Sequence, residues 1–223
     1  MKFLFNFASR SRTDNFFRGV KSIEDNMSGE NTYEIIGVFD RDDEAMNNPE
    51  VIEKLNKTKN LKYYFGESFG KIHAVSREVD KFGDFDILIN ESDDMVFTKK
   101  HFDKDIVGAM PEDLDGYLHF RDTNHTTPDA LTTLHVVGKK YFDRDRFIYH
   151  PAYISLWADN FNDALAKKRG KYKFIPTVIF NHLHPIFKKA PMDAQYEKTE
   201  DKKVYRADFL TYHKMLRNIK QYL

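Results

Sequence analysis

Short apolar runs alternate with amphipathic segments through roughly the first 100 residues of the chain. Each apolar run has the length of a buried strand and is followed by a polar turn. We expect strands over residues 3–8, 33–39, 61–65 and 85–89, with helices over residues 14–23, 50–55 and 68–79 between them. Strands and helices that alternate in this way predict βαβ units and a parallel sheet.

The second half of the chain is less regular. Residues 114–120 and 131–137 predict two strands that are antiparallel to each other, with a polar loop over residues 121–129 between them. A helix is expected over residues 159–168, and Gly170 suits the position just after its end.

The last part of the chain predicts a strand and then a helical tail. The strand is expected over residues 172–180, where Pro176 suits a sheet edge or a bulge. From Asp193 onward the segment is charged and helical. We therefore expect one α/β domain over residues 1–190, with residues 191–223 as a helical extension of the same domain.

Composition narrows the class of protein. Lys and Arg together number 35, as do Asp and Glu, so no overall charge attracts nucleic acid. Cysteine is absent, which excludes disulfides, a thiol nucleophile and a cysteine-ligated zinc site. No apolar run reaches the roughly 18 residues of a membrane span. We expect a cytoplasmic protein without a membrane span.

Two adjacent carboxylates, Asp93 and Asp94, follow the strand predicted over residues 85–89. Neighbouring carboxylates repel each other unless a cation compensates them. Their hard oxygen atoms suit Mg²⁺ or Mn²⁺, which in turn bind the phosphates of a nucleotide. A solvated acidic turn is the other interpretation. The position at the end of a central strand, where parallel sheets bind ligands, makes the two interpretations about equal.

A second acidic cluster follows the strand predicted over residues 33–39 and contains Asp40 and Asp42. An acidic side chain there can accept hydrogen bonds from a ribose hydroxyl or a base N–H. A polar loop between strand and helix explains the same residues, and it is the better explanation for this cluster taken alone.

His182 and His184 occupy alternate positions of an extended segment and so lie on one face of it. Neutral imidazole is a good ligand for Zn²⁺ or Mn²⁺. Two histidines do not hold a metal by themselves, so the other ligands are expected from Asp93 or Asp94. A structural or surface role for the histidines is the alternative.

Two helical segments carry further candidates. Asp159 lies close to the only tryptophan, Trp157, at the start of a predicted helix. A carboxylate there either caps the helix or acts as a general base toward a substrate hydroxyl. Lys71 and Arg77 lie on the helix predicted over residues 68–79, where one of them can meet a diphosphate. Solvated helix charges are the alternative for that pair.

Taken in order, these segments resemble the GT-A glycosyltransferases. The order is a strand and Ser-Arg (9–10), a strand and Asp-X-Asp-Asp (40–43), Gly-Lys-X-X-Ala-X-X-Arg (70–77), a strand and Ser-Asp-Asp-Met (92–95), Trp-X-Asp (157–159) and a late His. The chain is most similar to the family 2-type enzymes and their short, phage-type relatives. The resemblance implies an α/β, Rossmann-like GT-A fold: a mainly parallel central sheet flanked by helices, a small antiparallel part and a C-terminal helix.

The resemblance also implies roles for individual residues. Asp159 matches the catalytic base of inverting members, and Trp157 beside it is expected on the acceptor side. Asp94, His182 and His184 match metal-binding positions. The residues expected to contact the nucleotide-sugar are Ser9, Arg10, Asp40, Asp42, Lys71, Arg77 and Asp93.

The implied function is metal-dependent, inverting transfer of a sugar from a nucleotide-sugar, with a UDP-sugar as the expected donor and Mn²⁺ or Mg²⁺ as the metal. The acceptor hydroxyl is expected on a saccharide or on a hydroxymethylated pyrimidine of phage DNA, in the host cytoplasm. Groups available to hold a flipped base are Tyr141, Phe142, Arg144, Arg146 and the lysine-rich residues 167–173.

The chain departs from the family pattern in two places. The first acidic position of the family's Asp-X-Asp element falls on Asn90 or Glu91, and Ala158 replaces the Glu of the family's Glu-Asp pair. Two other functions fit the same fold: a nucleotidyltransferase, or a non-catalytic module that binds nucleotide or metal. Residues 7–13 contain no Gly, whereas a nucleotidyltransferase usually has a Gly-rich loop there.

Overall fold

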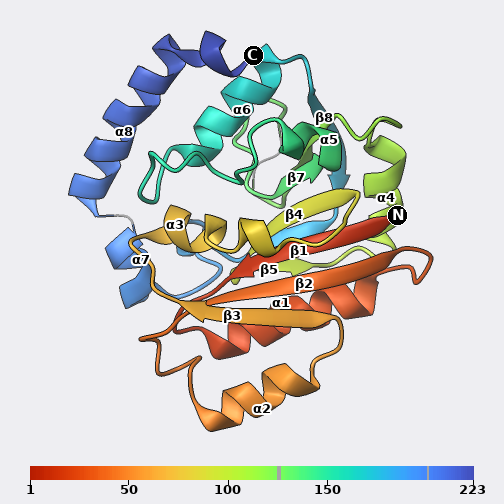
Figure 1. The fold of residues 1–223 in the computed structure, drawn as a ribbon, viewed down its shortest axis with the longest axis vertical. Coiled ribbons are helices and arrows are strands. Elements are labelled where there is room, and N and C mark those ends of the chain that lie inside the picture. Colours follow the sequence, from red (N-terminus) through yellow and green to blue (C-terminus); the bar gives the residue numbers. More distant parts are fainter. Residues whose placement is uncertain (125–126, 200) are drawn as a thin grey trace.

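The computed structural model describes residues 1–124, 127–199 and 201–223, so part of the loop predicted over residues 121–129 lies outside the described residues. The chain forms a seven-stranded sheet flanked by helices and a separate two-stranded sheet (Figure 1). The strands are β1 (Lys2–Ala8), β2 (Thr32–Asp40), β3 (Leu61–Gly66), β4 (Ile87–Ser92), β5 (Met95–Phe97), β6 (Tyr117–Arg121), β7 (His135–Gly138), β8 (Tyr172–Val178) and β9 (Phe180–His182). The helices are α1 (Thr13–Asn26), α2 (Pro49–Lys57), α3 (Lys71–Ser76), α4 (Phe102–Ala109), α5 (Lys139–Asp143), α6 (Ala158–Lys168), α7 (Ala194–Thr199) and α8 (Lys202–Arg217).

The main sheet has the strand order β3-β2-β1-β4-β7-β6-β8. Its first four strands are mutually parallel. Strand β7 is antiparallel to both β4 and β6, so the antiparallel pair predicted in the second half is confirmed. Strand β8 then runs parallel to β6. The mainly parallel α/β sheet predicted from the sequence is therefore confirmed.

The two faces of the sheet carry separate cores because successive strand residues point to opposite faces. On one face, Phe3, Phe5 and Phe7 of β1 pack with buried side chains of α1, α2 and α4. On the other face, Leu4 packs with those of α3, α5, α6 and α8. The first core is rich in phenylalanine, and Phe97 and Phe102 stack in it with ring centroids 4.0 Å apart. The sheet is thus held rigidly between two helical layers.

Several elements differ in extent from the sequence prediction. Helix α3 covers only Lys71–Ser76. It begins late because Gly70 before it adopts φ +147° and lies against the backbone of Ile154, and a separate 3-10 turn forms over Val79–Lys81 beyond its end. Strand β4 continues to Ser92, which is farther than expected. The strand predicted over residues 172–180 divides: β8 ends at Val178, and β9 pairs with β5 in the small antiparallel sheet.

Strand β8 lies at an edge of the main sheet, and its register with β6 shifts between Phe120 and Arg121. Pro176 lies in this strand, where the missing N–H leaves no gap in the interior of the sheet. The position predicted for Pro176 is confirmed.

The C-terminal residues are helical, as expected. Helix α8 packs on α6, and Met215 and Ile219 are buried in the core on that face (Figure 1). The division of the chain at residue 190 stays a prediction. Within the described part of the chain, no helix combines the length and apolar character needed to cross a membrane.

Gly138 tests how tightly this sheet packs. A Cβ atom at Gly138 would lie 2.2 Å from the backbone oxygen of Leu114, so Gly138→Ala forces backbone to move. We expect a loss of about 1–3 kcal/mol in the free energy of unfolding, measured in urea. Gly108→Ala is the matched control, because nothing lies within 4 Å of that Cβ position and alanine favours the helix. Equal stability of the two variants would contradict the packing described here.

Candidate active site

The carboxyl ends of three neighbouring strands meet at one edge of the sheet. Ala8, the last residue of β1, pairs with Val38 of β2 and with Ser92 of β4. The loops after these strands therefore emerge side by side. The hydroxyl of Ser9 donates to Asp93 Oδ2 at 2.7 Å, which joins the first loop to the acidic cluster after β4.

Arg10 joins the first loop to the loop after β2. Its Nη1 lies 2.7 Å from Asp40 Oδ2 and 2.7 Å from Asp42 Oδ1, and these hydrogen bonds to Asp42 and Asp40 raise the pKa of the guanidinium. Arg77, just after α3, donates from Nη1 to Asp40 Oδ1 at 3.3 Å and from Nη2 to the Phe39 carbonyl at 2.7 Å. The structure thus brings Ser9, Arg10, Asp40, Asp42 and Arg77 to one place.

Asp93 is buried between the hydroxyl of Ser9 and the guanidinium of Arg12. Arg12 Nη1 donates to Asp93 Oδ1 at 2.9 Å. Burial raises the pKa of Asp93, and the charge of Arg12 opposes that rise. Arg12 lies two residues after Arg10 in the same Ser-Arg-Ser-Arg segment, and nothing in its local sequence marks it for this role.

Asp94 lies against His182 of β9. His182 Nε2 is 3.3 Å from Asp94 Oδ2, and His182 Nδ1 is 3.8 Å from Asp122 Oδ2. Burial opposes the charged form of both groups, but the pairing overcomes it. The pKa of Asp94 falls well below its usual range, mainly through His182, and the two carboxylates raise the pKa of His182 to about 9. Asp122, which the sequence analysis missed, is thus part of the site.

His184 lies next to this pair. Its ring centroid is 5.4 Å from that of His182, and its Nδ1 accepts the N–H of Ile186 at 3.3 Å. Within the described part of the chain, no three His, Asp or Glu side chains are already grouped for a metal ion. However, Asp94 Oδ1 is buried and lacks a hydrogen-bond partner in the described structure. Asp94 and His182 therefore fit two ligands of an ion whose other ligands come from a bound molecule.

Asn90 and Glu91, the two candidates for the first acidic position of the family's Asp-X-Asp element, point to opposite faces of the sheet because they are neighbours in β4. Asn90 faces α3 and α6, and its Oδ1 accepts a hydrogen bond from Asn6 at 2.9 Å. Glu91 faces α1, where its carboxyl group is buried and has no hydrogen-bond partner among the described residues. Burial and the charge of Asp94 raise the pKa of Glu91 well above its usual range. Asn90 is thus the residue on the face that carries Asp159.

Asp159 lies in the first turn of α6 and is within electrostatic reach of the acidic edge. Burial raises its pKa, while the charge of Lys71 and a hydrogen bond from Tyr149 oppose the rise. Lys71 also lowers the pKa of Asp94, so this exposed ammonium acts on both carboxylates. Tyr149 is buried and hydrogen-bonded to both Asp159 and Asn90.

Trp157 precedes α6 in a left-handed conformation, φ 63°, and its ring packs on α8. Its neighbours there are Tyr205, Phe209 and Tyr212, with centroid distances of 5.5, 5.0 and 5.2 Å. The expected contact of Trp157 with an acceptor stays a prediction.

Helix α8 also fixes the loop before Asp159. Both carboxylate oxygens of the buried Asp208 accept backbone N–H groups, from Ile154 at 2.9 Å and from Ser155 and Leu156 at 2.8 Å. The carbonyl of Ile154 in turn accepts the N–H of Ile72 in α3 at 3.1 Å. The helices that carry Lys71 and Asp159 are thus tied to one loop.

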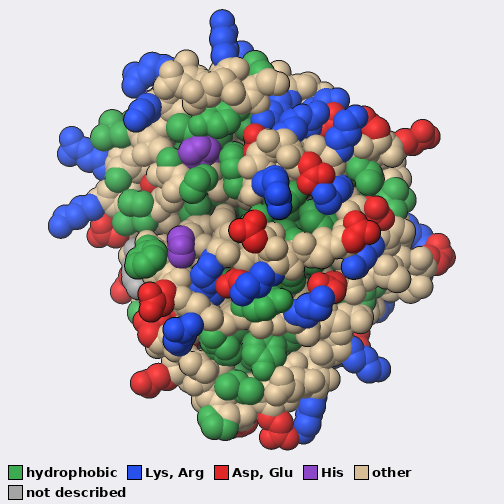
Figure 2. Space-filling model, viewed as in Figure 1, with side chains coloured by type: hydrophobic (Ala, Val, Ile, Leu, Met, Phe, Trp, Pro, Cys, Tyr) green, Lys and Arg blue, Asp and Glu red, His purple; other side chains and the backbone are tan. Residues whose placement is uncertain are grey.

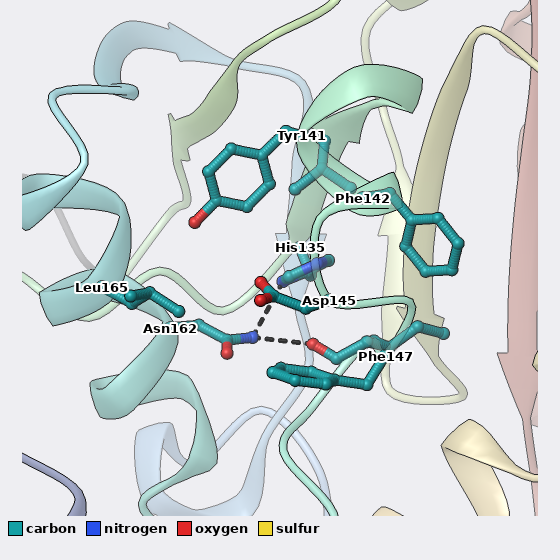
Figure 3. Close-up of a pocket in the computed structure, with 9 residues that line it drawn as sticks. His135, Tyr141, Phe142, Asp145, Phe147, Asn162 and Leu165 are labelled. Atoms are coloured by element: carbon teal, nitrogen blue, oxygen red, sulfur yellow. Dashed lines mark hydrogen bonds between the residues drawn. The ribbon is translucent and has the colours of Figure 1, made fainter. Parts of the chain in front are cut away.

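A small cavity lies beside α6 and contacts His135, Asp145 and Asn162 (Figure 3). Its volume of about 10 Å³ holds at most one water molecule. Asn162 Nδ2 lies 3.3 Å from His135 Nδ1 and 2.9 Å from the Ile148 carbonyl, and burial lowers the pKa of His135 to about 3. This cavity is too small for a nucleotide.

Comparison with solved structures identifies the fold as that of GT-A proteins, as the sequence resemblance implied. No family model matches the chain, and no curated protein matches it in sequence. A fragment of S. aureus TarS (1–349) in complex with UDP-GlcNAc superposes with a TM-score of 0.62 at 12% identity, over 81% of this chain and 58% of that one. A larger TarS structure is matched over 36% of its length, so the chain spans well under two thirds of these proteins.

The mannosyltransferase PcManGT from Pyrobaculum calidifontis, in complex with GDP-Man and Mn²⁺, also has this fold. It superposes with a TM-score of 0.63 at 11% identity, over 99% of this chain and 73% of that one. At such identity the likeness establishes the fold, while the function must be argued from this chain's own residues.

The pairing of His182 with two carboxylates has a measurable consequence. Since its pKa is raised to about 9, the protonated ring stabilises the metal-free protein fully below its ordinary pKa of about 6.5. That stabilisation is lost as the pH rises through about 9. In an NMR titration, Asp122→Asn should lower the pKa of His182 by about 1 unit or more. Asp105→Asn, which removes an ion pair with Lys99 instead, should leave it unchanged. An unaltered pKa in Asp122→Asn would contradict the pairing.

Proposed function

We propose that the chain is a metal-dependent, inverting glycosyltransferase that moves a sugar from a UDP-sugar to an acceptor hydroxyl. The observation that carries the proposal is that Asp94 and His182 meet at the carboxyl edge of the parallel strands, while the Ile154 carbonyl ties the loop before Asp159 to α3. A candidate base and a candidate metal ligand therefore belong to one site at the edge where parallel sheets bind ligands. The solved structures of this fold with UDP-GlcNAc and with GDP-Man and Mn²⁺ support the same reading.

The donor is proposed to lie along the loops after β1, β2 and β4. Asp40 and Asp42 offer carboxylate oxygens to a ribose or a base, while Arg10 and Arg77 hold these carboxylates in place. Ser9 and Asp93 are proposed to continue the donor site toward the phosphates, and Lys71 offers an exposed ammonium to the diphosphate. These groups are proposed to contact the nucleotide part of the donor rather than its sugar.

Asp94 and His182 are proposed to hold Mn²⁺ or Mg²⁺, with His184 next to them and the donor phosphates completing the coordination. Such an ion, when bound, neutralises the negative charge that develops on the leaving diphosphate. His182 must lose its proton to serve as a ligand, so metal binding is expected to release protons below about pH 9.

Asp159 is proposed as the general base. A base is most effective when its pKa approaches the working pH, and burial raises that of Asp159. The hydrogen bond from Tyr149 orients the carboxylate. In the proposed step, Asp159 removes the proton of the acceptor hydroxyl. The hydroxyl oxygen then attacks the anomeric carbon of the sugar as the bond from that carbon to the diphosphate breaks. Attack from the face opposite the leaving group inverts the configuration.

The acceptor is proposed to be a saccharide, with a hydroxymethylated pyrimidine in DNA as the alternative. The groups considered for a flipped base take part in the fold: Tyr141 and Phe142 are buried, and Arg144 forms two hydrogen bonds with Asp115. On the face drawn in Figure 2, Lys and Arg side chains are interspersed with Asp and Glu. Both observations favour the saccharide.

Metal-dependent nucleotide binding is the first test. Thermal unfolding with UDP, GDP and CDP should show stabilisation by UDP that requires Mn²⁺. In Asp94→Asn, which lacks a proposed metal ligand, UDP should stabilise the protein much less, and adding Mn²⁺ should no longer increase that stabilisation. Asp105→Asn serves as the control. No stabilisation by any of these nucleotides with Mn²⁺ would refute the proposed donor binding.

Sugar transfer is the second test. A panel of UDP-sugars is incubated with saccharide acceptors and with hydroxymethylated DNA, and product is measured by mass spectrometry. Asp159→Asn should lower kcat by about 10²–10⁴-fold while UDP binding is retained. Glu50→Gln, which changes a carboxylate in the first turn of α2, controls for the helix dipole. Undiminished transfer by Asp159→Asn rules out the base, and release of diphosphate from a sugar phosphate and a nucleoside triphosphate indicates a nucleotidyltransferase.

A further inference from the structure

The segment before and within α7 lies across the acidic edge of the sheet (Figure 1). Asp193 accepts two hydrogen bonds from Arg12, from Nε at 2.9 Å and from Nη2 at 2.7 Å. Three residues later, the hydroxyl of Tyr196 donates to Asp94 Oδ2 at 2.9 Å. We call residues 193–196 the strap. It contacts the cation beside Asp93 and also the carboxylate proposed to bind metal.

Tyr196 fills the space beside these groups. The guanidinium carbon of Arg12 lies 3.8 Å from the centroid of its ring, and the ring of His184 lies 4.7 Å away on centroids. With the strap in place, Asp93, Asp94 and Tyr196 are each only 7% exposed. The phenol and His182 both contact Asp94 Oδ2, and Oδ1 is buried, so an ion that carries a nucleoside diphosphate has to displace the phenol to bind this carboxylate through Oδ2.

Residues close to the strap on both sides are exposed, whereas the strap itself contacts buried groups of the site. Met192 before it is 56% exposed, and Ile186 farther upstream is 71% exposed. Asp201, Lys202 and Lys203 at the start of α8 are exposed as well. Arg12, Asp94 and His184 are among the residues that hold the strap against the site.

We propose that the strap is an autoinhibitory latch, in which Tyr196 and Asp193 occupy the places of the metal ion and the diphosphate. This inference rests on the proposed donor site. Binding of the metal with a nucleoside diphosphate releases the strap and leaves Arg12 free to meet the phosphates. Since only the open form binds, the apparent affinity equals the intrinsic affinity multiplied by the open fraction. Weakening the latch therefore strengthens binding, whereas loss of an ordinary binding residue weakens it.

Titration calorimetry of the full chain with UDP in the presence of Mn²⁺ tests the latch. Tyr196→Phe keeps the ring against Arg12 and removes the hydroxyl on Asp94. Asp193→Asn removes the charge that pairs with Arg12 and retains an oxygen for the Tyr196 N–H. Each variant should bind UDP about three- to tenfold more tightly than the wild type, the effect of one hydrogen bond that opposes binding.

Two matched controls lie away from the strap. Tyr63→Phe removes a phenol hydrogen bond to Asn56 of 2.8 Å, and Asp25→Asn removes an exposed ion pair with Lys21 of 2.9 Å. Both should bind as the wild type does. Unchanged or weaker binding by Tyr196→Phe and Asp193→Asn overturns the latch. In the wild type, hydrogen exchange of the amides of residues 193–197 should quicken when Mn²⁺ and UDP are added, and unchanged or slower exchange also overturns it.

Mn²⁺ alone distinguishes failure of the latch from failure of the proposed function. The double variant Tyr196→Phe/Asp193→Asn should take up Mn²⁺ more tightly than the wild type, as measured by electron paramagnetic resonance. If it does so and yet binds none of UDP, GDP and CDP, the latch is supported and the proposed donor is wrong. If it takes up no more Mn²⁺ than the wild type, the latch is wrong.

Discussion

Mutual repulsion among buried carboxylates is the constraint on which the site depends. Three parallel strands bring Asp40, Asp93 and Asp94 to a single edge of the sheet, where little water is available to screen them. Each of them is met by a cation: Arg10 and Arg77 at Asp40, Arg12 at Asp93, and His182 at Asp94. Since an unpaired buried charge is strongly destabilising, these cations are needed for folding as much as for any ligand.

The same pairing allows the site to exchange one positive partner for another. When an incoming cation replaces the Arg or His beside a carboxylate, the negative charge of that carboxylate stays paired throughout the exchange. The ends of the strands therefore suit a ligand that carries its own positive ion. In contrast, Glu91 faces α1 without a hydrogen-bond partner among the described residues, and its environment favours the uncharged carboxyl group.

Much of the fold follows from local patterns along the chain. The first four strands, their parallel order and the edge position of Pro176 were predicted because each depends on hydrophobic periodicity or on the missing N–H of proline. The short strands β5 and β9 were missed as a pair. Three residues carry too little periodicity, and their pairing joins segments far apart in the sequence.

The residues of the candidate site likewise divide into those that the local sequence predicts and those that it does not. The acidic strand ends, Arg10, Arg77 and His182 carry a positional signal, since each directly follows a strand or lies in a recognisable motif. Arg12 and Asp122 also follow strands, but nothing local distinguishes them from other charges of their loops, and Tyr196 reaches the site only through tertiary folding. The start of α3 was predicted too early because Gly70 lies against the backbone of Ile154, a contact with no counterpart in the local sequence.

Pro176 has a consequence beyond the architecture of the sheet. An open sheet presents unpaired N–H and C=O groups along its outermost strands, which can recruit a strand from another molecule. In β8, Pro176 withholds one donor from this row, and the irregular register with β6 disturbs its spacing. A second chain is therefore offered an interrupted template for intermolecular β-pairing along this strand.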